Sequence, residues 1–190
     1  MPNSVRKPTK DRLIETARKL FLGEGVPQTG INKITAEADV ARMTLYNNFA
    51  SKDDLVLAVF EREAELRRDA IQAMQEDLDG PFERVLALFC VANDVASQKG
   101  FRGCAFINLA IEAAAPDSVL HALARQHKAW IRANIRTQLG EDFFSDPHVL
   151  AQQIALLWDG GIVGAYVHQS DRPIDSAREA ARTLMRAATQ

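Results

Sequence analysis

Polar side chains that can make paired hydrogen bonds cluster between residues 42 and 47. Arg42 carries a planar guanidinium with several donors, and Asn47 carries a carboxamide that both donates and accepts. Groups of these two types can bind the edges of guanine and adenine in the major groove of DNA. Leu45 and Phe49, in the same segment, are large apolar residues. We therefore expect a short helix with one side buried and the other side exposed to a partner.

A break at Asp39 and Val40 separates this segment from the one before it. The spacing predicts a helix over residues 30–38, a sharp turn, and a second helix over residues 41–48. The turn would need positive φ at Asp39, which Asp tolerates better than most residues. Two such helices packed on an earlier one form a helix-turn-helix DNA reader, here at about 30–49. The residues expected between the helices are Ile34, Ala38, Val40, Leu45 and Phe49, and those expected to face DNA are Asn32, Arg42, Thr44, Tyr46 and Asn47.

Helical periodicity continues along the rest of the chain. An S-x-x-D cap at Ser51 predicts a long helix to about residue 78, and Asp146 with Pro147 predicts the start of another. About nine helices and no convincing strand make the fold class all-α. The other predicted helices cover residues 10–24, residue 81 to the stop at 99–103, 104–115, 117–139 and 174–188.

Several short motifs surround the helix-turn-helix segment. They are A-x-x-L-F in the first predicted helix, Gly25 after it, Thr29 before Ile31, Val40 in the turn, T-L-Y-x-x-F at 44–49 and S-K-x-x-L at 51–55. With these motifs, residues 10–60 resemble the DNA-binding domain of the TetR family of bacterial transcription regulators. The rest of the chain is similar to that family only in helix count and length. The resemblance implies an all-helical homodimer with a DNA-binding domain at 8–54 and a ligand-binding and dimerisation domain at 55–190.

The resemblance also implies a set of DNA contacts, position by position. Asn32 and Arg42 would read base edges, Met43 and Thr44 would touch thymine methyls, and Tyr46 and Lys52 would contact phosphates. Asn47 would read a base or a phosphate. Thr29 is placed to cap the helix after it and is counted with these residues. Alternatively, Met43 and Tyr46 pack within the domain, and Arg6 and Lys7 either reach the minor groove or form a solvated tail.

Two positions depart from the family pattern. Asp39 stands where the family usually has Gly, and Ala41 stands where it usually has Ser or Thr at the start of the recognition helix. A missing N-cap hydroxyl costs roughly 0.5–2 kcal/mol. We expect an adjusted turn and a weaker cap, with the reader preserved.

The composition is that of a soluble globular protein. The 190 residues are 47% apolar and 25% charged, with no run of 18 apolar residues that could span a membrane. The first residues lack the apolar segment of a signal peptide, and two cysteines are too few for a disulfide framework. These features predict a cytoplasmic protein. The net charge is -2, but residues 1–52 contain more basic than acidic residues. This basic excess only slightly favours a polyanionic partner.

The second half of the chain contains large apolar side chains and a few polar ones, which are the residue types that line small-molecule sites. Apolar walls with a few polar groups between helices suit a moderately apolar organic effector. The alternative is that the aromatic residues are simply core. The candidates are Phe89, Asn93, Phe106, Asn108, Glu112, Trp130 and Trp158.

Cys104 follows a basic residue at a predicted helix N-terminus, a setting that favours a thiolate. It is a candidate redox or electrophile sensor, although buried inert cysteine is the commoner case. The four histidines show no metal-binding spacing, and we expect neither a metal nor a cofactor. Gly160, Gly161 and Gly164 suit close helix approach, which predicts a dimer through the last two helices or, alternatively, packing within the chain.

These features predict a regulator that binds a pseudo-palindromic site on double-stranded DNA as a homodimer. A repressor released by a small molecule is favoured over an activator or a ligand-independent architectural binder. A helical enzyme using Glu112, Asp159 or His127 is the rival from another class. No nucleophile, base and orienting group occur at readable spacing, so we expect no enzyme.

Overall fold

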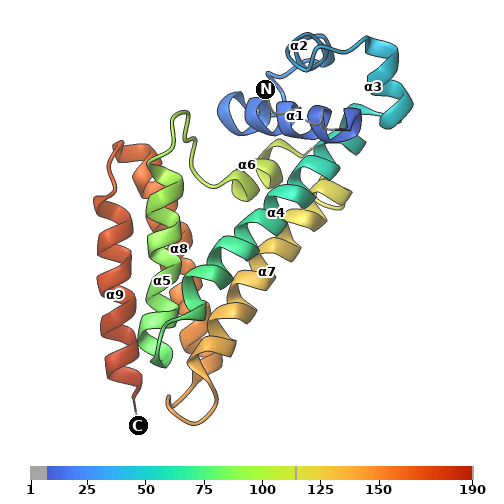
Figure 1. Ribbon diagram of the computed structural model, residues 1–190. Helices are drawn as coiled ribbons and strands as arrows, with labels where there is room; N and C mark the ends of the chain where they lie inside the picture. The colour runs from blue at the N-terminus through green and yellow to red at the C-terminus, as the bar shows by residue number, and fades with distance from the viewer. Residues whose placement is uncertain (1–7, 114, 190) are drawn as a thin grey trace, which may run out of the picture.

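Helices make up most of the computed structural model, which describes residues 8–113 and 115–189. Nine helices and no strand lie in these residues, in agreement with the all-α prediction. Helices α1–α3 form one end of the molecule, and the C-terminal helices extend away from them (Figure 1). The helices are α1 (Thr9–Glu24), α2 (Ile31–Glu37), α3 (Arg42–Asn48), α4 (Lys52–Glu76), α5 (Gly80–Ala96), α6 (Ala105–Glu112), α7 (Val119–Leu139), α8 (Pro147–His168) and α9 (Arg172–Ala188).

Helix α4 connects the two parts of the chain. It packs on α1, α5 and α7, and α7 runs beside it in Figure 1. Leu55, Val59 and Phe60 are buried near its start, and Ile71 is buried near its end. A movement of α4 therefore changes the position of α1 relative to the C-terminal helices.

Caps predicted from the sequence begin two of the long helices. The Ser51 hydroxyl accepts from the Asp54 backbone N–H at 3.0 Å, and the Asp146 carboxylate accepts from the Val149 N–H at 2.9 Å. Ser118 caps α7 in the same way through the His121 N–H, so that helix begins two residues later than predicted. Helix α6 is shorter than predicted and ends at Glu112.

The last two helices pack closely against each other. A Cβ added to Gly164 would lie 2.8 Å from the Cβ of Pro173, and one added to Gly161 would lie 3.1 Å from the Cβ of Ala177. These two glycines therefore serve contact between α8 and α9 within the chain, which was the alternative interpretation. Gly160 faces open space instead. Close to it on α8, Leu156 is 73% exposed, and Val163 and Val167 are also exposed.

No helix in the described part of the chain is long and apolar enough to cross a membrane.

Candidate nucleic-acid interface and cavity

The turn between α2 and α3 has the backbone geometry that the sequence predicts. Asp39 adopts a φ of 51°, in the left-handed region. From α1, the Arg12 guanidinium donates to the carbonyls of Ala38 at 3.2 Å and Asp39 at 3.3 Å. Sequence patterns did not single out Arg12, because its partners are backbone atoms 26 and 27 residues away. The turn is thus held from outside by the first helix.

The apolar side of the helix-turn-helix is buried as predicted. Ile34, Ala38, Leu45 and Phe49 belong to the core, and Val40 packs against it. Because α3 is only seven residues long, this packing and the turn determine its orientation. The N-cap residue of α3 is Ala41, which has no side-chain cap bond.

The opposite side of α3 is exposed. Met43 is 68% and Tyr46 38% exposed, and Arg42 and Asn47 are exposed beside them, so Met43 does not pack within the domain. The Arg42 guanidinium lies 5.6 Å from the centre of the Tyr46 ring, one turn away. Thr44 is half-buried, and its carbonyl accepts from the Asn48 carboxamide at 2.8 Å.

Three residues around α2 complete the predicted set. Asn32 is exposed on α2. Lys52 is half-buried, and its ammonium donates to the Val26 carbonyl at 2.6 Å. Thr29 is fully buried and its hydroxyl donates to the Gly25 carbonyl at 2.8 Å, so the predictions that it caps α2 and faces DNA are wrong. Gly30 is the N-cap of α2. Arg6 and Lys7 lie outside the described residues.

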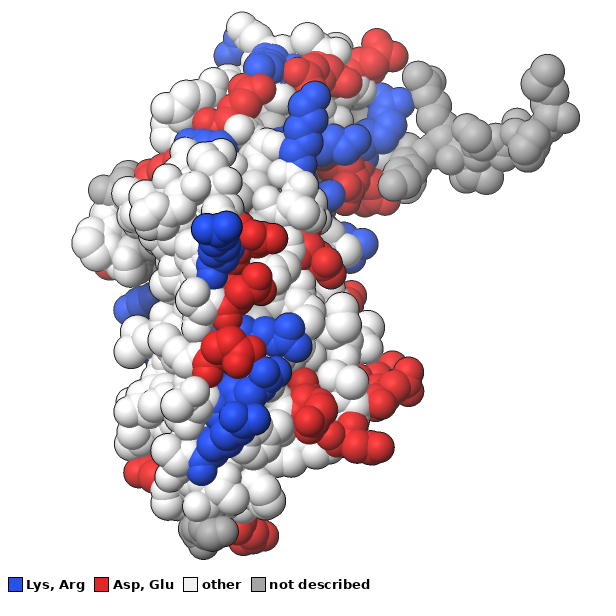
Figure 2. Space-filling model, turned by 90° about the vertical axis from the view of Figure 1, so that its left-hand side faces the viewer, with Lys and Arg blue, Asp and Glu red and all other residues white. Residues whose placement is uncertain are grey.

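Charges of both signs lie next to each other on the surface. In the view of Figure 2, blue and red side chains alternate over the end that carries α1–α3 and along the C-terminal helices. The basic excess of residues 1–52 therefore does not make a uniformly basic surface on this face.

A cavity of about 250 Å³ lies where α1 meets the C-terminal helices. Its walls come from α1, α4, α5, α6, α7, α8 and the loop between α5 and α6. Of the predicted ligand residues, Phe106, Asn108, Glu112 and Trp158 line it. The other three do not. Phe89 is fully buried in the core, Asn93 donates to the Asp175 carboxylate on α9 at 3.1 Å, and Trp130 packs on the core from another side.

Aromatic rings line the buried part of the cavity. The rings of Phe106 and His127 stack with centroids 3.6 Å apart, and Phe60 meets Phe106 edge-on at 5.8 Å. Trp158 is buried, and its indole N–H donates to the Leu88 carbonyl at 3.4 Å. These rings make the buried part of the cavity wall largely apolar.

His127 is the polar residue of this wall. Its side chain is only 2% exposed. Burial, and after it the positive charges of Lys128, Arg67 and Arg68, lower the pKa of its imidazole to about 3. The imidazole is therefore neutral at pH 7. Its Nδ1 has no hydrogen-bond partner among the described residues. Sequence reasoning considered His127 only for metal or catalysis.

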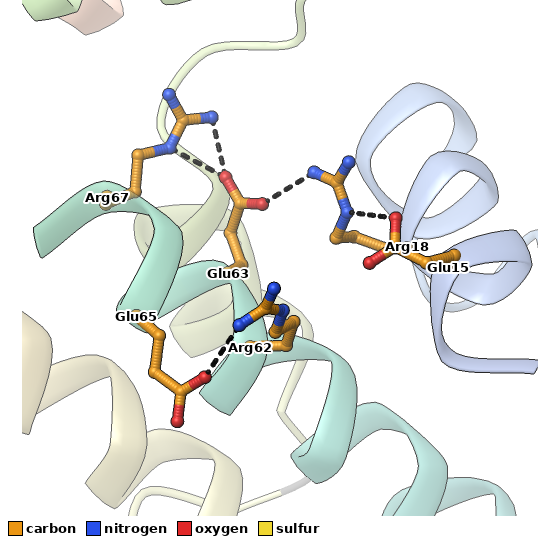
Figure 3. A network of polar contacts seen from close by, with 6 residues as sticks. All are labelled: Glu15, Arg18, Arg62, Glu63, Glu65 and Arg67. Carbon is orange, nitrogen blue, oxygen red and sulfur yellow. Dashed lines mark hydrogen bonds and ion pairs between the residues drawn. The ribbon is translucent and has the colours of Figure 1, made fainter. Parts of the chain in front are cut away.

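Two arginines of the cavity wall share one buried carboxylate. Glu63 of α4 is 1% exposed and accepts from Arg18 of α1 at 2.9 Å and from Arg67 of α4 at 2.6 Å. Figure 3 shows its carboxylate between the two guanidiniums, with Glu15 on the far side of Arg18. The network joins α1 to α4 at the cavity.

A second polar contact connects the cavity wall to the helix-turn-helix domain. Glu112, at the end of α6, accepts through Oε2 from the Val26 backbone N–H at 3.1 Å. The carbonyl of the same Val26 accepts from Lys52. Val26 lies in the loop between α1 and α2, so a cavity residue is bonded directly to the helix-turn-helix domain.

Cys104, at the N-terminus of α6, also lines the cavity and is buried. The Lys128 ammonium donates to its sulfur at 3.2 Å and to the Asp159 carboxylate at 2.5 Å. It also lies 5.0 Å from the Trp158 ring. The described residues contain no group of three or more potential metal ligands.

Comparison with known proteins decides the family. A model of the bacterial regulatory proteins of the tetR family matches residues 13–59, and a model of the tetracyclin repressor-like C-terminal domain matches residues 81–181. The chain belongs to the TetR family. HTH-type transcriptional repressor DhaR from Mycobacterium sp. (strain GP1) is 24% identical over 184 residues, which cover 90% of this chain and 89% of DhaR.

Solved structures share the whole TetR fold with this chain. A TetR-family transcriptional regulator from Streptomyces coelicolor has a TM-score of 0.87 and 28% identity, covering 96% of both chains. NemR from E. coli in its reduced form has a TM-score of 0.81 and 21% identity, covering 92% and 95%. TetR-family proteins are transcriptional regulators, typically ligand-responsive repressors, and not enzymes. This TetR-family chain is accordingly a DNA-binding transcriptional regulator.

Proposed function

We propose that this protein is a cytoplasmic repressor that leaves its operator when a small organic molecule enters the cavity. The observation that carries the proposal is the hydrogen bond from the Val26 N–H to Glu112, because it connects the cavity wall to the helix-turn-helix domain. A ligand that moves Glu112 would also move Val26 and the loop between α1 and α2. The proposed domain boundary, between residues 54 and 55, lies in the first turn of α4.

The proposed DNA interface is the exposed side of α3 with its neighbours. Arg42 and Asn32 would read base edges, and Met43 and Thr44 would contact thymine methyls. Tyr46, Asn47 and Lys52 would bind phosphates or a base edge. Exposure of Arg42, Met43, Tyr46 and Asn47 supports this set, and Thr29 is no longer part of it.

We place the homodimer contact on α8 and α9. Leu156, Val163 and Val167 form an exposed apolar stripe on α8, and Gly160 between them leaves room for close approach. A two-fold contact through this stripe would hold two readers on one side of the dimer. Readers related in this way bind an inverted repeat whose half-sites are one or more helical turns apart.

Release would follow from a tilt of α4. The ligand has to bind the released conformation more tightly by a few kcal/mol to shift the population. The Glu63 network and the Glu112 bond are the contacts that would differ between the two conformations, because both join the cavity to α1 or its following loop.

The test is selection of bound sequences from random DNA, followed by affinity measurements on the selected site. An inverted repeat is the expected result. Arg42→Ala should abolish sequence-specific binding without changing the melting temperature. Arg132→Ala, an exposed arginine on α7, is the matched control and should bind normally. Recovery of no enriched sequence would refute the proposal, and transcription with and without the gene separates repressor from activator.

A second candidate function is electrophile or oxidant sensing by Cys104. The observation favouring it is the Lys128 ammonium 3.2 Å from the sulfur in the cavity wall. The Cys104 thiolate, formed by loss of the thiol proton to solvent, would add to the C=C bond of an electrophile such as N-ethylmaleimide. The S–C bond forms as the C=C π bond breaks, and the adjacent carbon takes up a proton from solvent. Operator release by N-ethylmaleimide should then disappear in Cys104→Ser and persist in Cys90→Ser. Persistence of release in Cys104→Ser would exclude this function.

A further inference from the structure

Cations dominate the charged part of the cavity wall. Arg18, Lys19, Arg67, Lys99 and Arg102 line it, whereas Glu112 is its lining carboxylate. With Glu63 and Glu15, which pair with Arg18 and Arg67 from outside the lining, cations still outnumber carboxylates five to three. Lys128 and Asp159 pair with each other nearby and leave this balance unchanged. The charged groups at the wall therefore have a net positive formal charge. The pKa of His127 is lowered mainly by burial and, after burial, by nearby cations that include Arg67 of this wall.

Arg102 is a cation of the cavity wall that makes no close ion pair in the described residues. It is half-buried and lies in the loop before α6. A Cβ on Gly25 would lie 2.6 Å from Arg102 Nη1 and 3.1 Å from Glu112 Oε1. Gly25 thus lets the Arg102 guanidinium and the Glu112 carboxylate reach the same place at the end of α1.

The buried part of the cavity suits a flat apolar body. The Phe106–His127 stack, Phe60 and Trp158 supply ring faces and edges. Nδ1 of His127 is an unpaired polar atom in a side chain that is almost completely buried. A ligand with one polar group near the imidazole could satisfy it. The volume of about 250 Å³ is just below the usual range of about 300–1,000 Å³ for small-molecule sites, which favours a small ligand.

We propose that the effector is a small aromatic carboxylate, with its ring against Phe106 and Trp158 and its carboxylate bound by Arg102. This inference rests on the proposed ligand-released repressor and specifies the chemical class of its ligand. A guanidinium binds a carboxylate through two parallel hydrogen bonds, which suits an anion at Arg102. The bound anion repels the nearby Glu112 carboxylate and weakens its bond to the Val26 N–H. Effector charge is thereby transmitted to the helix-turn-helix domain.

The test compares matched probes, 1-naphthoate with 1-naphthamide and benzoate with benzamide, which differ in charge but hardly in shape. Binding is measured by calorimetry and by the change in tryptophan fluorescence, to which Trp130 and Trp158 both contribute. Each acid should bind at least tenfold more tightly than its amide. Arg102→Met should remove this preference, Arg102→Lys should retain most of it, and Arg132→Met, on the exposed side of α7, should leave it unchanged. Melting temperatures show whether each variant is folded.

Equal affinity for acid and amide, no saturable binding of either acid, or a preference that survives in folded Arg102→Met would overturn the inference. Operator binding, measured by fluorescence anisotropy in the same samples, separates this result from failure of the proposed function. If the wild type binds its selected operator but prefers the amides, only the effector class is wrong. If it binds no operator, the repressor proposal fails whatever the probes do.

Discussion

The side of α3 that we propose reads DNA and the wall of the cavity both present arginine, but in opposite settings. Arg42 is exposed and stacks on Tyr46 of its own helix. Arg18 and Arg67 come from two helices and share the carboxylate of Glu63, which is buried. Arg42 therefore contacts a residue of its own helix, whereas Arg18 and Arg67 join α1 to α4 through Glu63. Changes in the two regions should consequently differ in their effect on folding.

The largest effect on stability is expected at Glu63. Glu63→Ala removes the carboxylate between two guanidiniums at the junction of α1 and α4, which leaves Arg67 without this partner and Arg18 with Glu15 alone. Breaking a buried pair in this way costs about 3–5 kcal/mol. Urea denaturation of the variant and the wild type measures the loss in the free energy of unfolding.

Glu65→Ala is the matched control for Glu63, on the same helix and in the same view (Figure 3). Glu65 pairs with Arg62 at 3.2 Å, and both side chains are exposed. Exposed pairs contribute roughly 0–1 kcal/mol. Equal losses in the two variants would contradict the distinction between a buried junction and a solvated surface.

The buried imidazole of His127 should make the stability of the folded protein depend on pH. The pKa of this imidazole is about 3 in the folded protein, whereas the unfolded chain has the ordinary histidine value of 6.5. As pH falls below 6.5, the unfolded chain takes up a proton here that the folded chain does not, so stability falls until pH reaches about 3. Between pH 7 and pH 5 the loss from this group should be about 2 kcal/mol.

Unfolding of His127→Gln at both pH values isolates this contribution, because the other titrating groups remain. The variant should lose about 2 kcal/mol less than the wild type over the same interval. His148→Gln, at an exposed position on α8, is the control and should behave as the wild type. A wild-type pH dependence retained in His127→Gln would show that the imidazole is not the group responsible.

The smallest effect is expected at the start of the recognition helix, and it should be stabilising. Ala41 is exposed at the N-cap of α3, without a side-chain cap bond. Ala41→Ser supplies a hydroxyl for the free backbone N–H groups and should raise stability by about 1 kcal/mol. Ala36→Ser, exposed within α2, is the control and should give no gain. Thermal unfolding followed by circular dichroism measures both, and an equal gain in both variants would argue against capping.

Sequence reasoning succeeded where a residue acts on its immediate neighbours. The caps at Ser51 and Asp146 and the positive φ at Asp39 involve atoms within a few residues. It was wrong at Thr29, whose hydroxyl had more than one possible partner, and it left two interpretations open at the glycines of α8. Thr29 could cap α2 or bond backward, and it bonds to Gly25. The glycines of α8 could face a second subunit or α9, and Gly161 and Gly164 face α9.

The amino-acid sequence by itself determined the helices, the helix-turn-helix and the exposed side of α3, because each follows from periodicity and capping over a few turns. Only the tertiary structure decided which residues of the C-terminal domain line the cavity. Phe89 and Phe106 are both buried apolar residues on helices, yet only Phe106 also lines the cavity. This difference depends on how the seven wall segments are placed relative to one another. The same placement brings Arg102, His127 and the Glu63 network to the cavity. No local sequence pattern predicts that placement.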